Sequence, residues 1–108
     1  MTIDAMEVAP YYQLGLIRTF RSKDTEKIFQ RQPAPRFPPD LRRLAQRKLL
    51  LLDAAEQLND LRALPGNRFE RLAADRKGQH SIRINDRLRI CFRWIDGDAY
   101  DVEIVDYH

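Results

Sequence analysis

The chain has 108 residues, the length of one small domain, and a hydrophobic fraction of 44%, which is sufficient for a core. Its formal net charge is +3, and this basic balance favours an anionic partner, nucleic acid before a membrane. The single cysteine excludes an internal disulfide framework and suits the cytoplasm, and no apolar run approaches the roughly 20 residues of a membrane span.

The first 15 residues differ from the rest. They contain Asp4 and Glu7 but no lysine or arginine, and they show no strong period, which predicts a poorly ordered leader before a domain at 16–108. The domain is expected to open with a short strand at 16–21. A short helix over 24–31 follows, with Ser22 as its N-cap.

A proline-rich connection over 32–39 leads to the main predicted helix, which begins near Pro38-Pro39-Asp40. Its outer face is basic, and this face is either a solvated surface or a phosphate-contacting one. A second short helix is expected over 56–63. The turn that follows, Leu64 to Asn67, has proline and glycine at the positions typical of type II. The residues expected on the buried face of the main helix recur at helical spacing: Leu41, Leu44, Ala45, Lys48, Leu49 and Leu52. The basic face comprises Arg42, Arg43 and Arg47.

A short strand over 68–72 should lead into three alternating strands, which occupy the C-terminal third. We expect a three-residue loop at Asn85-Asp86-Arg87 between the first two. Between the last two we expect the three-residue loop Asp96-Gly97-Asp98, because a two-residue loop at Asp96-Gly97 would mix apolar and polar faces. These loops pair Ile84 with Leu88, Ile82 with Ile90, Trp94 with Tyr100, Phe92 with Val102, and Ile90 with Ile104.

The polar face of these strands holds the candidate site. The register pairs Arg93 with Asp101 and places Arg83 opposite Arg89, an unfavourable contact that a bound anion would relieve. Tyr107 should fall on the same face. The simpler interpretation is that these arginines are solvated, as most arginines on exposed sheet faces are. Together the elements predict an α+β class, with two to three helices on one side of a curved, mostly antiparallel sheet of four to five strands.

Four blocks of the sequence closely resemble HigB-type toxins of the RelE/ParE superfamily, and the resemblance runs from about Leu16 to the end. The blocks are Pro65 to Arg68, Asp75 to Asp86, Arg89 to Trp94 and Val102 to His108. The resemblance implies a RelE-like fold and the toxin of a type II toxin–antitoxin pair. It also implies a ribosome-dependent mRNA endoribonuclease that inhibits translation, a helix-turn-helix antitoxin of the HigA type, and contact with DNA only through the antitoxin complex.

The resemblance also implies roles for individual residues. Arg89 matches an arginine that contacts the scissile phosphate, and Asp106, Tyr107 and His108 match the C-terminal catalytic residues. The implied chemistry is attack of the ribose 2′-OH on the adjacent phosphate without a metal or cofactor, and one cysteine with two histidines could not form a Cys/His zinc site without carboxylates or a second chain. Asp106 and His108 would carry protons, and Tyr107 would position or stack a base. The residues expected to bind RNA are Arg76, Lys77, Arg83 and Arg87.

The chain departs from the family pattern at several positions. Ala73 and Ala74 stand where many relatives have a lysine and then a glycine, Leu88 replaces a usual tryptophan, and Glu70 could act as a base where some members have histidine. Residues 1–15 precede the usual start and are expected to be a misannotated leader. Two alternatives to a ribonuclease stay open: a topoisomerase-directed toxin of the same superfamily, and a non-cleaving module that binds RNA or antitoxin.

Overall fold

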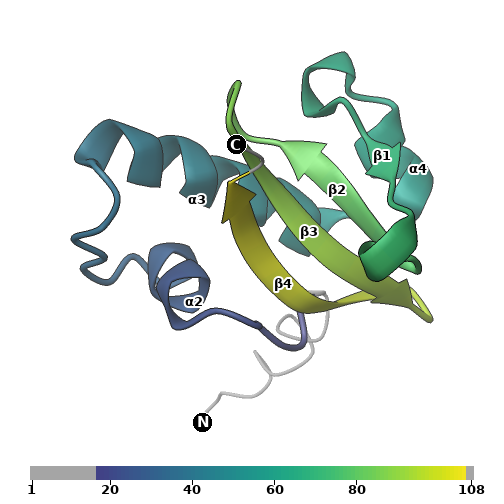
Figure 1. Ribbon diagram of the computed structural model, residues 1–108, viewed down its shortest axis with the longest axis horizontal. Coiled ribbons are helices and arrows are strands. Elements are labelled where there is room, and N and C mark those ends of the chain that lie inside the picture. Colours follow the sequence, from purple (N-terminus) through teal and green to yellow (C-terminus); the bar gives the residue numbers. More distant parts are fainter. Residues whose placement is uncertain (1–16, 107–108) are drawn as a thin grey trace, which may run out of the picture.

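Three helices pack on one face of a four-stranded antiparallel sheet in the computed structural model, which describes residues 17–106 (Figure 1). The strands follow each other in the sheet in chain order, β1-β2-β3-β4. This arrangement confirms the predicted α+β class and its numbers of helices and strands. The predicted leader 1–15, Tyr107 and His108 lie outside the described residues. The elements are α2 (Lys23–Phe29), α3 (Pro39–Ala54), α4 (Leu58–Arg62), the 3₁₀ turn η1 (Pro65–Asn67), β1 (Glu70–Arg71), the 3₁₀ turn η2 (Ala74–Arg76), β2 (Gln79–Arg83), β3 (Leu88–Ile95) and β4 (Asp98–Asp106).

Local sequence signals define where the helices begin. The Ser22 hydroxyl accepts a hydrogen bond from the Thr25 amide at 3.2 Å, as predicted for the N-cap of α2. In α3 a proline occupies the first turn, where its missing N–H costs nothing. Gln57 and Asp60 form a reciprocal capping box at the start of α4. Within residues 17–106, no helix has the length and apolar composition needed to cross a membrane.

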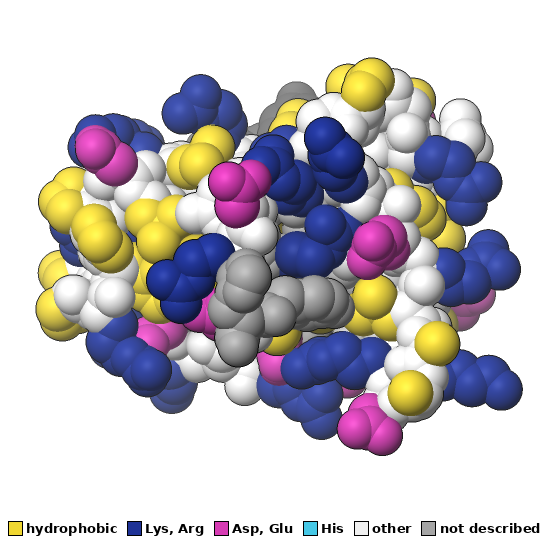
Figure 2. Space-filling view, turned by 45° about the horizontal axis from the view of Figure 1, so that its top comes forward, with side chains coloured by type: hydrophobic (Ala, Val, Ile, Leu, Met, Phe, Trp, Pro, Cys, Tyr) yellow, Lys and Arg dark blue, Asp and Glu magenta, His cyan; other side chains and the backbone are white. Residues whose placement is uncertain are grey.

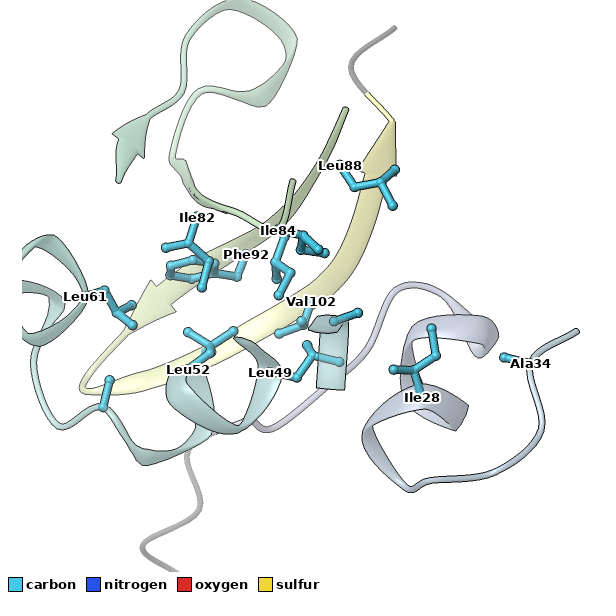
Figure 3. Packing of buried hydrophobic residues seen from close by; sticks show 14 residues of the cluster. Ile28, Ala34, Leu49, Leu52, Leu61, Ile82, Ile84, Leu88, Phe92 and Val102 are labelled. Carbon is cyan, nitrogen blue, oxygen red and sulfur yellow. The ribbon is translucent and has the colours of Figure 1, made fainter. Parts of the chain in front are cut away.

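The core lies between the helices and one face of the sheet (Figure 3). The predicted face of α3 is confirmed, since Ala45, Leu49 and Leu52 are fully buried and Leu41 and Leu44 pack against the core. Each large aliphatic or aromatic side chain buried in this way contributes about 1.5–3 kcal/mol. Because the helices cover this face of the sheet, polar side chains occupy the other face. The fully buried residues that the sheet contributes to this core are Ile82, Ile90, Phe92, Ala99 and Val102.

The hairpin between β2 and β3 has the predicted register. Ile82 pairs with Ile90, and Arg83 pairs with Arg89. The loop is closed by Asn85, whose side-chain oxygen accepts hydrogen bonds from the amides of Arg87 and Leu88 at 2.9 and 2.8 Å.

The predicted loop between β3 and β4 is wrong. The loop has two residues, Asp96 and Gly97, both with positive φ (52° and 87°), as a type I′ turn requires. A β-bulge restores the alternation of faces: beyond it Cys91 pairs with Glu103, whereas before it Arg93 pairs with Tyr100. The pairing of Ile90 with Ile104 is therefore as predicted, whereas Trp94 pairs with Ala99 instead of Tyr100.

Three other elements differ from expectation. The predicted first strand is reduced to two parallel bridges beside β4, from Ile17 to Ala99 and from Phe20 to Val102. The strand predicted over 68–72 is only two residues long, β1. The segment 65–67 is a 3₁₀ turn and not a type II turn, because Gly66 is not among the residues with positive φ.

His80 lies on the core face of β2 between two aromatic rings. Its imidazole stacks on Phe69 at a centroid distance of 5.4 Å and lies 5.8 Å from Phe92. Its Nδ1 atom is buried and has no hydrogen-bond partner among residues 17–106. Burial, and then the positive charges of Arg71 and Arg62, lower the pKa of His80 below its ordinary value.

Candidate functional site

The face of the sheet away from the core carries a basic hollow at the end of β2 and the start of β3. The hollow has a volume of about 420 Å³. Lysine and arginine side chains gather over this part of the surface, with acidic side chains beside them (Figure 2). The lining residues are Arg68, Glu70, Arg83, Asn85, Asp86, Arg87 and Arg89.

Arg89 is the most rigidly held of these arginines. Its Nε donates to the Ser81 hydroxyl at 2.7 Å, its Nη2 donates to the Arg68 carbonyl at 2.5 Å, and the Glu70 carboxylate lies 3.9 Å from Nε. The side chain is only 12% exposed. The guanidinium is thus fixed in place before any ligand arrives, which is the arrangement that stabilises a developing negative charge without reorganisation.

The backbone that supports Arg89 is itself anchored in the core. Arg68 has the left-handed conformation (φ 43°), which turns the chain out of η1. The preceding Asn67 is fully buried, donates from Nδ2 to the Leu61 carbonyl at 3.0 Å, and accepts from Lys48 Nζ at 2.7 Å. Burial, followed by the charges of Arg83 and Arg47, lowers the pKa of Lys48. A polar network from α3 therefore sets the position of the carbonyl that holds Arg89.

The other arginines of the hollow have acidic partners at its edge. Arg83 forms an ion pair with Asp86 at 2.5 Å, which relieves part of the repulsion from Arg89 opposite it. Arg87 forms an ion pair with Asp106 at 2.7 Å, and both side chains are substantially exposed. Exposed pairs of this kind contribute about 0–1 kcal/mol each. An incoming phosphate can therefore replace the carboxylates at small cost.

The structure brings together four of the residues predicted for the site and separates two others. Arg83, Arg87 and Arg89 line the hollow, and Asp106 reaches its edge through Arg87. Arg76 lies further along the same face, where it donates to Gln79 Oε1 at 3.0 Å and lies 3.7 Å from Glu103. Lys77, Tyr107 and His108 complete the predicted set: Lys77 is exposed in the connection before β2, and the other two lie outside the described residues.

Sequence reasoning did not assign roles to two residues that shape the hollow. Ser81 lies on the polar face of β2, two positions before Arg83. The side-chain alternation along β2 could therefore have indicated that Ser81 contacts Arg89. Arg68 reaches the site through its backbone conformation, for which the sequence holds no clear signal.

A shallower hollow of about 380 Å³ marks the position where the chain departs from the family pattern. Leu72, Ala73, Ala74, Asp75 and Arg76 line it. Ala74 has φ +52°, a conformation that glycine adopts without strain. The glycine that the family resemblance implies at this position would therefore match the local backbone better than alanine does.

Comparison with known proteins gives a consistent result. The profile of the family described as "RelE-like toxin of type II toxin-antitoxin system HigB" matches residues 18–108. Toxin HigB-1 of Vibrio cholerae serotype O1 is 42% identical over 81 residues, which are 74% of this chain and 85% of that toxin. Endoribonuclease HigB of Proteus vulgaris is 31% identical over 94 residues, which are 86% of this chain and 100% of that enzyme.

A solved structure shares the fold. The YoeB-YefM complex from Staphylococcus aureus contains a chain that superposes with a TM-score of 0.53 at 15% sequence identity. The match covers 85% of this chain and 97% of the other.

Proposed function

Because the chain belongs to the HigB family of RelE-like toxins from type II toxin–antitoxin systems, we propose that it is an endoribonuclease that cleaves mRNA on the ribosome and so inhibits translation. Four arginines around one preorganised hollow are the observation that supports this activity. Clustered arginines bind phosphate through charge-assisted, often bidentate hydrogen bonds. We place the scissile phosphate in this hollow.

The proposed reaction is transfer of the phosphate to the neighbouring ribose. A base removes the proton from the 2′-OH, the 2′ oxygen forms a bond to phosphorus, and the bond to the 5′ oxygen breaks as that oxygen receives a proton. The products carry a 2′,3′-cyclic phosphate and a 5′-OH. In this scheme Arg89 stabilises the charge that develops on the phosphate, with Arg83 as support. Glu70, 3.9 Å from Arg89 Nε, is positioned as a candidate base.

The C-terminal residues supply the remaining proposed roles. Asp106 stands at the edge of the hollow in an ion pair with Arg87. Tyr107 and His108 follow it directly in the chain, and their roles as base-stacking group and proton carrier rest on the family resemblance. Arg76 and Lys77 would contact RNA beyond the hollow, along the same face of the sheet. The antitoxin of this proposed cytoplasmic pair would be a helix-turn-helix protein of the HigA type, which contacts DNA on behalf of the complex.

The proposal is tested with purified full-length protein, ribosomes programmed with a defined mRNA, and mapping of the new 5′ ends. Arg89→Ala is expected to lower the cleavage rate by about 100-fold or more, the typical loss when one such donor is removed. Arg93→Ala is the matched control, because Arg93 lies on the same face of β3 but pairs with Asp101 outside the hollow.

The two competing functions predict different results. Undiminished cleavage by Arg89→Ala would place the chemistry elsewhere. Growth arrest by the wild type without RNA cuts would point to a topoisomerase-directed toxin, and a folded protein that neither cuts RNA nor arrests growth would be a binding module.

A further inference from the structure

The outer edge of β4 is covered by the segment that leads into α2 and by α2 itself. Within residues 17–106, β4 is the last strand of the sheet, so one of its edges has no neighbouring strand that could accept its amide hydrogens. The segment before α2 forms only two isolated bridges with this edge, at Ile17 and Phe20. Buried backbone amides without an acceptor destabilise a fold, so further acceptors along this edge have to be side chains.

Two threonine hydroxyls supply acceptors along this edge. Thr19 Oγ1 accepts the amide hydrogen of Asp101 at 2.8 Å. Thr25 Oγ1 accepts the amide hydrogen of Ile104 at 3.0 Å. Thr25 lies in the first turn of α2 and is only 1% exposed, and Figure 1 shows α2 beside β4. A helix side chain therefore replaces the backbone carbonyl that a further strand would present to Ile104.

Neither helix formation nor core packing explains a threonine at position 25. A β-branched residue has a lower helix propensity than alanine or leucine, and a buried hydroxyl is favourable only where it finds hydrogen-bond partners. Ile28, the other buried residue of α2, belongs to the core as an aliphatic side chain. The hydrogen bond from Ile104 is therefore the contact that accounts for a polar side chain at this buried position.

The contact between Thr25 and Ile104 lies close to the C-terminal half of the proposed site. Ile104 precedes Asp106 by two residues of β4, which span about 7 Å in an extended strand. Tyr107 and His108 follow Asp106 directly in the chain. A displacement of β4 at Ile104 would therefore be transmitted to the residues for which catalytic roles are proposed.

The phosphate-binding half of the site has a different anchor. The Arg89 guanidinium is held by the Ser81 hydroxyl and by the carbonyl of Arg68, which follows the buried Asn67. Ser81 belongs to β2, which lies on the side of β3 opposite to β4. Loss of the hydrogen bond to Thr25 should therefore loosen the end of β4 and leave the guanidinium of Arg89 in place.

We propose that Thr25 is a positioning residue for RNA cleavage: through its hydrogen bond to Ile104 it fixes the end of β4 and so places Asp106 beside the phosphate that Arg89 binds. The inference rests on the proposed endoribonuclease function and adds a residue of α2 to it. It divides the site into two halves with separate anchors. Substrate binding depends on the anchor of Arg89, whereas the rate of the bond-breaking step depends on Thr25.

The test compares Thr25→Val, which removes the hydroxyl at nearly constant shape, with Thr25→Ser, which keeps it, in the full-length protein. On ribosomes programmed with a defined mRNA, Thr25→Val is expected to lower kcat by about tenfold or more, because a misplaced catalytic group loses rate, while KM stays within about threefold. Thr25→Ser should restore most of kcat. Ile28→Val is the matched control, because it removes one buried methyl group from the same helix without touching Ile104, and its kcat should stay within about twofold. Thr25→Ala is a second variant without the hydroxyl, in which alanine favours the helix.

Amide hydrogen exchange provides a measurement that does not depend on RNA cleavage. In Thr25→Val the amides of Ile104 and Asp106 should exchange at least about tenfold faster than in the wild type, while the amide of Arg89 changes by less than about threefold. An unchanged kcat in Thr25→Val and Thr25→Ala would overturn the inference, as would an equal loss in Thr25→Ser or Ile28→Val. If the wild type cleaves no RNA, the endoribonuclease proposal fails by itself. An Asp106 amide that exchanges at the wild-type rate in Thr25→Val would overturn the positioning role in either case.

Discussion

Asn67 is predicted to be a major contributor to stability despite its position in a surface turn. Asn67→Ala removes the hydrogen bond to the Leu61 carbonyl and leaves Lys48 Nζ without its 2.7 Å acceptor. Loss of one partner from a buried hydrogen bond costs about 1–3 kcal/mol, and Lys48 is partly buried, so the two losses together should amount to about 2–4 kcal/mol. This is a large share of the roughly 5–15 kcal/mol that stabilises a domain.

Urea unfolding followed by circular dichroism measures this loss as a lower midpoint at constant slope. Asn59→Ala on the exposed surface of α4 is the control and should change the free energy of unfolding by less than about 0.5 kcal/mol. Because the Arg68 carbonyl follows Asn67 directly, the folded variant should also cleave RNA more slowly. A loss below about 0.5 kcal/mol would refute the argument that this buried amide anchors the turn.

Two further predictions follow from individual residues. Ala74→Gly should raise the free energy of unfolding by about 1 kcal/mol, because φ is +52° there, whereas Ala73→Gly, at φ −128°, should not; urea unfolding of both variants measures the difference. The pKa of His80 is lower in the folded state than its ordinary value of 6.5, so the unfolded chain takes up a proton first as the pH falls. Stability from His80 is therefore complete above pH 6.5 and declines below it down to the folded pKa. In His80→Phe the part of the acid destabilisation due to His80 should disappear, and an equal decline in both proteins between pH 7.5 and 5 would contradict this.

The sequence predicted most of the fold because its signals are local. The serine cap of α2, the proline start of α3 and the apolar period of α3 each act within a few residues, and all three are found as expected. Alternation of side chains likewise predicted the pairing of Ile82 with Ile90. The prediction for the β3–β4 loop was wrong because it assumed that apolar and polar side chains alternate without interruption along both strands. The type I′ turn is favourable for Asp96-Gly97, and a bulge elsewhere in the hairpin corrects the faces.

The bulge is stabilised by contacts from a distant part of the chain. Its extra residue, Asp101, has φ +55° and donates its amide hydrogen to the Thr19 hydroxyl at 2.8 Å. The next residue, Val102, donates its amide hydrogen to the Thr19 carbonyl at 3.0 Å. These bonds join residues about 80 positions apart, so no local pattern around Asp96-Gly97 could reveal them. The bulge leaves backbone amides of β4 without partners in the hairpin, and Thr19 accepts hydrogen bonds from them. The hairpin can therefore keep its preferred two-residue turn and still bury Val102 fully.

The same distinction between local and distant contacts explains what could be predicted of the site. The opposition of Arg83 and Arg89 follows from strand register, and the structure confirms it. The immobilisation of Arg89 does not, because it depends on a carbonyl presented by a left-handed residue after a buried asparagine. Arginines on an open sheet face are usually mobile and solvated. Arg89 differs from Arg87 because it donates hydrogen bonds to the buried Ser81 hydroxyl and to a backbone carbonyl, whereas Arg87 pairs with an exposed carboxylate. The fixed position of Arg89 on β3 therefore depends on tertiary contacts, which α3 and η1 supply.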